Sequence, residues 1–112
     1  MTDRKKAPYT IDHRQWIAET PDVRVQILTL GEGQEIPWHY HSTVSDSFTC
    51  LDGPMVIAMH GDEPRRELQA GETYAVPAGT PHRVAGKDDG PCRFLVVQGI
   101  GTYDFVPVDG GS

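Results

Sequence analysis

This chain of 112 residues is poor in cysteine, in basic charge and in long apolar runs, and each shortage excludes a class of protein. Two cysteines, Cys50 and Cys92, do not make a disulfide framework, so we expect free thiols. The net charge of -6, from 10 basic and 16 acidic side chains, argues against a nucleic-acid partner. The longest apolar run, Met55 to Met59, is too short to cross a bilayer, so no membrane partner is expected. No apolar stretch follows the basic residues near the N-terminus as in a secretory signal, which predicts a cytoplasmic location.

Turn-forming residues are abundant, and amphipathic helices longer than about two turns are missing. The chain has 12 glycines and 9 prolines, spread between short apolar or alternating runs that are typical of strands. We therefore predict an all-β fold, either a closed barrel or a two-sheet sandwich. The strands are expected near residues 23–27, 36–41, 46–51, 55–60, 72–76, 82–85, 93–98 and 103–108. Residues 9–20 have no clean period and fit a strand, a turn or an interface segment.

The expected domain organisation is simple. Residues 1–20 form an N-terminal arm that is a candidate for a dimer interface, residues 21–108 form one barrel, and residues 109–112 form a frayed tail. Within the barrel, Gly53, Gly79 and Gly86 suit turn positions with positive φ.

Histidine is the residue type whose positions carry chemical information. His39 and His41 are separated by one residue, and on a strand such residues point to the same face. Asp46 follows five residues after His41, and His82 comes after a Pro-x-Gly turn on a distant segment. Three imidazoles and a carboxylate that converge inside a barrel are typical of a site for a first-row divalent metal.

These residues belong to a spaced frame of two motifs. In the first, five residues separate Gly33 from the His39-Tyr40-His41 triplet, four residues precede Asp46, and six precede Gly53. In the second, five residues separate Gly71 from Pro77-Ala78-Gly79, two residues precede His82, and three precede Gly86. The frame resembles the two motifs of the cupin superfamily, and the short gap between them is similar to that of small bacterial single-domain cupins. The resemblance implies a double-stranded β-helix, or jelly-roll barrel, and assigns the metal-ligand roles to His39, His41, Asp46 and His82.

Asp46 departs from the cupin pattern, which usually has a glutamate here. Aspartate is one methylene shorter, about 1.5 Å of reach. Three roles are therefore open for Asp46. It is a direct metal ligand, it acts through a water molecule or on the substrate as a general base, or it is a solvated acid in a loop. The second departure, Gly86 in place of the family's asparagine, is expected to be a turn effect.

Four further residues have open roles. Gln98 lies in the most apolar strand, where a buried amide needs partners, so it either lines the cavity with a catalytic role or makes an edge contact. If Asp46 points inward, strand alternation also turns Cys50 inward, near the site or into the core. His13 and His60 lie outside the frame and are expected on the surface.

Two functional classes remain open. The first is a metal-dependent enzyme, of dioxygenase, isomerase or lyase type, acting on a small polar oxygen-rich molecule. The second is a cupin module that binds a metal or metabolite without turnover. Mixed imidazole and carboxylate ligation favours Mn or Fe, with Ni or Zn as alternatives. Cupins of this size commonly pair, so a homodimer is expected.

Overall fold

The computed structural model describes residues 9–61 and 65–109 of the chain, and their regular structure is β-strand apart from a short 3-10 helix at Lys87–Asp89. Predictions about residues 1–8 and 110–112 lie outside the described residues. The strands are β1 (His13–Glu19), β2 (Val23–Leu30), β3 (Glu35–Tyr40), β4 (Ser45–Asp52), β5 (Met55–Met59), β6 (Arg65–Leu68), β7 (Thr73–Val76), β8 (His82–Gly86), β9 (Cys92–Gly99) and β10 (Val106–Pro107). No helix in the described ranges is long and apolar enough to span a bilayer.

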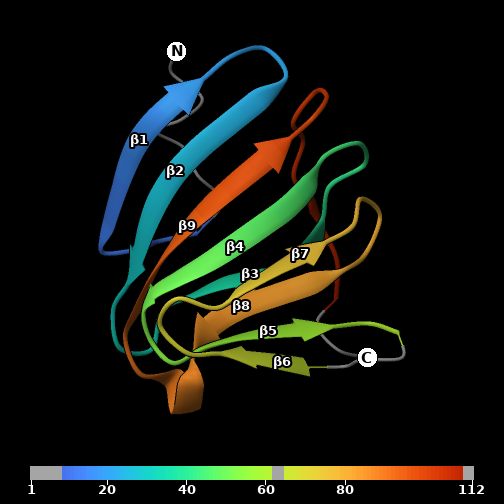
Figure 1. Cartoon of the computed structure of the whole chain (residues 1–112). Coiled ribbons are helices and arrows are strands. Elements are labelled where there is room, and N and C mark those ends of the chain that lie inside the picture. The colour runs from blue at the N-terminus through green and yellow to red at the C-terminus, as the bar shows by residue number, and fades with distance from the viewer. Residues whose placement is uncertain (1–8, 62–64, 110–112) are drawn as a thin grey trace.

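The strands form two five-stranded antiparallel sheets that face each other (Figure 1). We call them the first sheet, in the order β1-β2-β9-β4-β7, and the second sheet, in the order β10-β3-β8-β5-β6. Most neighbours in each sheet are distant in sequence, since β2 pairs with β9 and β3 pairs with β8. This arrangement is the double-stranded β-helix, so the fold prediction is confirmed.

The inward faces of the strands create a core with two unlike ends. At one end of the first sheet, Leu28 of β2, Phe94 of β9 and Cys50 of β4 lie in one row and are all buried. Two residues further along each strand the row is Gln26, Val96 and Phe48. The next row is Arg24, Gln98 and Asp46. Because side chains two apart share a face, the interior changes from apolar to polar along the strands.

The structure adds two strands and shortens another relative to the sequence prediction. Residues 13–19 form β1, which pairs with β2 as an edge strand, so this part of the ambiguous segment takes the strand alternative. The four-residue strand β6 was not predicted. The strand expected over residues 103–108 is limited to Val106–Pro107 in the structure. Short edge strands bury few side chains, so their sequences carry little periodicity.

Two of the three glycines expected at positive φ do not adopt it. Gly79 has a φ of 83°, as predicted, whereas Gly86 has a φ of -72°. Gly86 is instead required by packing, because a Cβ there would lie 1.9 Å from the carbonyl oxygen of Gly90. Gly53 also lies outside the positive region, and a Cβ there would lie 2.6 Å from Cys50 Sγ. Close approach, not turn conformation, explains both positions.

Candidate metal centre

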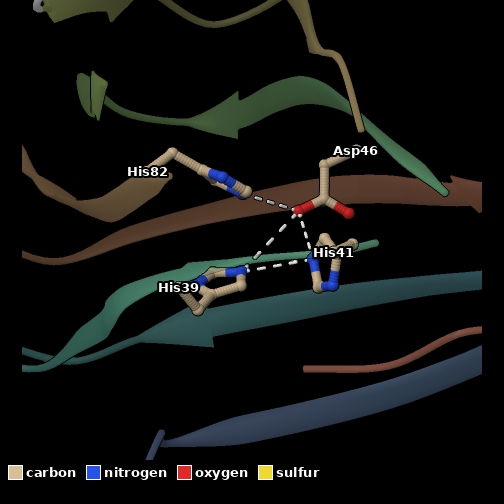
Figure 2. A group of neighbouring side chains, drawn as sticks. All are labelled: His39, His41, Asp46 and His82. Atoms are coloured by element: carbon tan, nitrogen blue, oxygen red, sulfur yellow. Dashed lines mark hydrogen bonds and ion pairs between the residues drawn. The ribbon is translucent and has the colours of Figure 1, made fainter. Parts of the chain in front are cut away.

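Four buried side chains meet between the two sheets (Figure 2). The second sheet and its immediate continuation supply three imidazoles. His39 lies in β3, His41 is the first residue after the end of β3, and His82 is the first residue of β8. His39 and His82 are direct cross-strand partners. The first sheet supplies Asp46, the second residue of β4. All four residues are at most 3% exposed, and one ligand atom from each lies within 4.8 Å of the others.

Local backbone features aim the histidines. The pairing of β3 with β8 shifts register between Ile36 and His39, around Pro37, which cannot donate a ladder hydrogen bond. On the other strand, the turn at Gly79 donates its N–H to the carbonyl oxygen of His41 at 2.8 Å. The turn that precedes His82 is therefore bonded to the segment that carries the histidine pair.

Each imidazole is anchored through Nδ1 to a backbone carbonyl. His39 Nδ1 lies 2.7 Å from the oxygen of Pro37, His82 Nδ1 lies 2.8 Å from that of Thr80, and His41 Nδ1 lies 2.5 Å from that of Asp104. A carbonyl oxygen only accepts, so each Nδ1 must carry the proton. The second ring nitrogen, Nε2, is then left with a lone pair in the neutral imidazole.

These lone pairs converge on one carboxylate oxygen. Oδ2 of Asp46 lies 2.9 Å from His41 Nε2, 2.8 Å from His82 Nε2 and 4.0 Å from His39 Nε2, while the Nε2 atoms of His39 and His41 are 3.2 Å apart. Four acceptors at such distances repel unless a cation or protons lie among them. Ligands at right angles around one transition-metal ion are about 3 Å apart, so the donor set fits a metal of the first row.

The electrostatics of the four groups are coupled. Burial raises the pKa of Asp46. When Nε2 of His41 and of His82 also carries a proton, each donates to Asp46, and these hydrogen bonds outweigh burial and hold the pKa of Asp46 below its usual range. Burial also disfavours the charged form of His41, which lowers its pKa. The hydrogen bond to Asp46 and the negative charge of that carboxylate outweigh burial, so the pKa of His41 is raised. Burial, together with the nearby His82, lowers the pKa of His39 to about 4. Asp46 is therefore ionised and His39 neutral near pH 7, as metal ligands must be.

The second oxygen of Asp46 is held by a chain of side chains in the first sheet. Gln98 Nε2 donates to Asp46 Oδ1 at 2.9 Å, Gln26 Nε2 donates to Gln98 Oε1 at 3.0 Å, and Arg14 donates to Gln26 Oε1 at 2.5 Å. Gln98 thus lies inside the barrel beside Asp46, and not at an edge. Gln26 was not predicted as a residue of the site. It alternates with Leu28 and Leu30, and this pattern indicates a polar side chain that faces inward.

The remaining residues considered in the sequence lie away from the ligand atoms. Cys50 is fully buried in the hydrophobic core, on the apolar row with Phe94, and both cysteines are free. His13 and His60 are exposed, and the ring of His60 packs on Trp38 with centroids 4.8 Å apart.

Two aromatic residues near the ligands were not singled out from the sequence. Phe105 stacks on His39 with a centroid distance of 4.3 Å, and Tyr103 contacts the ring of His41 at 5.1 Å. Both belong to the segment between β9 and β10, which has no alternating pattern. They restrict the room around the imidazoles on that side.

The chain combines a barrel of this topology with a buried cluster of three histidines and one acid. These two features define a class of small β-barrel proteins with a candidate metal centre. The model of the cupin domain matches residues 26–98, which include all four cluster residues. The chain belongs to the cupin family.

Comparisons with individual proteins agree on the fold. Over 58 residues the chain is 33% identical to quercetin 2,3-dioxygenase of Bacillus subtilis (strain 168). This match covers 52% of the chain but only 17% of that relative. A conserved protein with a double-stranded β-helix domain from Klebsiella pneumoniae superposes with a TM-score of 0.74 at 25% identity, covering 88% of this chain and 85% of that one. An oxalate oxidase structure superposes with a TM-score of 0.68 at 19% identity, covering 78% and 46%, which is a likeness of fold alone.

Proposed function

We propose that this cupin is a metal-dependent enzyme that acts on a small, polar, oxygen-rich molecule. The observation that carries the proposal is the convergence of three Nε2 lone pairs and one carboxylate oxygen at a buried point. His39, His41, His82 and Asp46 would hold one divalent ion, with Mn or Fe favoured and Ni or Zn as alternatives. A bound ion would supply Lewis-acid or redox chemistry at this point.

The chain's own residues have separate tasks in this proposal. Asp46 acts as a metal ligand rather than as a free general base, because Oδ2 faces the imidazoles and Oδ1 accepts from Gln98. Gln98 is a positioning residue that leaves one oxygen of Asp46 available to the ion. Phe105 stacks on His39 and Tyr103 contacts His41, so these two rings help to hold the imidazoles in place.

Among the reaction types open to such a site, dioxygenation has one supporting observation, the 33% identity to a quercetin dioxygenase over half of the chain. Isomerisation, lyase chemistry and binding without turnover are the alternatives. Fe(II)-loaded protein should consume oxygen with a flavonol, a diketone or a phenolic acid, as followed with an oxygen electrode. Metal occupancy without oxygen uptake across this panel would favour the alternatives.

Metal dependence itself is tested on purified protein. We expect the protein to contain a divalent transition metal by elemental analysis, and the metal-stripped form to gain thermal stability from Mn(II), Fe(II), Ni(II) or Zn(II). Protein that carries no metal and gains no stability from any of these ions contradicts the proposal.

We also propose that the chain forms a homodimer in the cytoplasm, with the N-terminal residues at the interface. The exposed apolar side chains Ile17 and Val97, on two strands of the first sheet, support a contact surface. Light scattering that gives a single species of 12.4 kDa would contradict the dimer.

A further inference from the structure

Arg24 is an inward-facing arginine at the polar end of the barrel. In β2 it lies opposite Gln98 of β9, which itself lies opposite Asp46 of β4. Since Arg24 is two residues from the buried Gln26, both side chains leave the same face of the sheet. Neighbouring strands are about 4.8 Å apart, so the backbones of Arg24 and Asp46 are separated by about 10 Å along one row.

The guanidinium of Arg24 packs on aromatic rings and has no acidic partner. Its Cζ lies 3.5 Å from the ring centroid of Tyr103 and 4.9 Å from that of Trp16. Its Nε is buried without a hydrogen-bond partner, and no Asp or Glu of the described residues pairs with it. Tyr103 does not serve as a counter-ion, because burial raises the pKa of its phenol above its usual range and the group stays neutral.

Arg14, the other inward arginine of this region, provides a useful contrast. It donates to Gln26 at 2.5 Å and to the hydroxyl of Tyr9 at 3.1 Å, so each of its two terminal nitrogens has an acceptor. Arg24 has the same chemistry and no such acceptors within the described part of the chain. A guanidinium with aromatic rings against its face keeps its in-plane N–H edge for an acceptor, and a carboxylate fits this fork with two parallel hydrogen bonds.

Tyr103 connects this arginine to the metal centre. Its ring contacts Arg24 and also the imidazole of His41. Arg24 is therefore one aromatic ring away from the imidazole of His41.

We propose that Arg24 binds a carboxylate of the substrate, and that the substrate is a small diacid or a related acid with an oxygen-bearing group at each end. One end meets the metal centre and the other meets the guanidinium. This inference rests on the proposed function, because the metal provides the first anchor.

The test uses Mn(II)-loaded protein and short dicarboxylates of increasing length, malonate, succinate and glutarate, with calorimetric titration. Wild-type protein should bind at least one diacid better than acetate. Arg24→Gln should weaken that diacid about tenfold while leaving acetate unchanged, because acetate reaches the metal alone. Arg24→Lys should recover part of the loss, since it keeps the charge but not the fork.

Arg93→Gln is the matched control, since Arg93 lies in the same sheet and pairs with Asp52 at the surface. Mn(II) affinity, measured for every variant, reports that the fold and the metal site are intact. Diacids that bind Arg24→Gln as tightly as wild type overturn this inference while the proposed function stands. Wild-type protein that takes up no metal overturns both.

A second inference comes from the direction of the hydrogen-bond chain. Arginine only donates and an ionised carboxylate only accepts, so the two ends fix the orientation of both amides between them. Oε1 of Gln26 must face Arg14, and Nε2 of Gln98 must face Asp46. We infer that Arg14 and Gln26, in strands that contribute no metal ligand, are positioning residues for Asp46.

Gln26→Leu should weaken Mn(II) affinity about tenfold and change the visible spectrum of the Co(II)-loaded protein, because Oε1 of Gln98 then loses its donor and the amide that holds Asp46 is free to move. Arg14→Met should act in the same direction, and Arg14→Lys, which still donates, should restore wild-type behaviour. Gln15→Leu, on the exposed face of β1, is the control. A wild-type Co(II) spectrum and wild-type affinity in Gln26→Leu would overturn the inference.

Discussion

The second sheet supplies three imidazoles to the centre, and the first sheet supplies one carboxylate. The imidazole anchors are backbone carbonyls, two of them only two residues away in sequence, at Pro37 and Thr80. The carboxylate is anchored by the side chain of Gln98, which is 52 residues away in sequence, and Gln98 is held in turn by Gln26. Orientation in the second sheet is thus mainly a property of local turns and a bulge, whereas in the first sheet it depends on the pairing of β1, β2, β9 and β4.

The largest effect is expected from removing an imidazole. His41→Ala deletes one of the four proposed ligands and leaves Asp46 with one fewer hydrogen-bond partner, so Mn(II) affinity should fall by at least about a hundredfold. Titration calorimetry measures the change. His60→Ala, which removes an exposed histidine, should bind like wild type; equal losses in both variants would show that the effect is not specific to the centre.

The next effect is expected from the chain in the first sheet. Gln98→Leu removes the donor to Oδ1 of Asp46 and frees the carboxylate to rotate, so metal affinity should fall about tenfold to a hundredfold. Thermal denaturation of the metal-free variant separates loss of folding from loss of binding. An unchanged metal affinity would mean that Asp46 needs no support from its own sheet.

A smaller and graded effect is expected from pH. The raised pKa of His41 means that a proton competes with the metal for Nε2, so affinity should be constant above this pKa and fall below it. One competing proton gives a decline of about tenfold per pH unit. Titrations at a series of pH values measure the slope, and an affinity that does not weaken on acidification would contradict His41 as a ligand.

The smallest effect is expected at Thr80, next to the local anchors. Thr80→Ala deletes the side chain but keeps the carbonyl that holds His82 Nδ1, so metal affinity should change less than about twofold. The difference in metal affinity between Thr80→Ala and Gln98→Leu compares the backbone anchors of the second sheet directly with the side-chain anchors of the first. A large loss in Thr80→Ala would show that the second sheet also depends on side-chain anchors.

The same contrast explains what the sequence can predict. The spacing of His39 and His41, and the turn before His82, are local signals, and they led to the cluster that the structure brings together. The alternation in β2 and the apolar run of β9 predicted strands, but the pairing that places Gln26 beside Gln98 joins distant segments and leaves no local pattern. The edge strand β6 was also beyond reach, and the segment of β1 was left with a strand as one of three alternatives, because half-exposed side chains give weak periodicity.

Arg24 is a further residue whose surroundings could not be predicted from the sequence. In the sequence it is one polar residue in an alternating strand, indistinguishable from a solvated surface arginine. Its role depends on contacts with Trp16, which precedes it in the sequence, and with Tyr103, which follows it by a long interval. Packing of this kind follows from the full topology and not from the spacing of residues in one segment.

The most direct test of the centre is nuclear magnetic resonance of the histidine rings, by long-range proton–nitrogen correlation, in metal-stripped protein at pH 8 and after one equivalent of Zn(II). The account predicts protonated Nδ1 atoms in His39, His41 and His82, and Nε2 resonances of these three rings that shift on metal addition while those of His13 and His60 do not. Nε2 resonances that do not respond to the metal, or metal-induced shifts that are larger at Nδ1 than at Nε2, would contradict these ligand assignments.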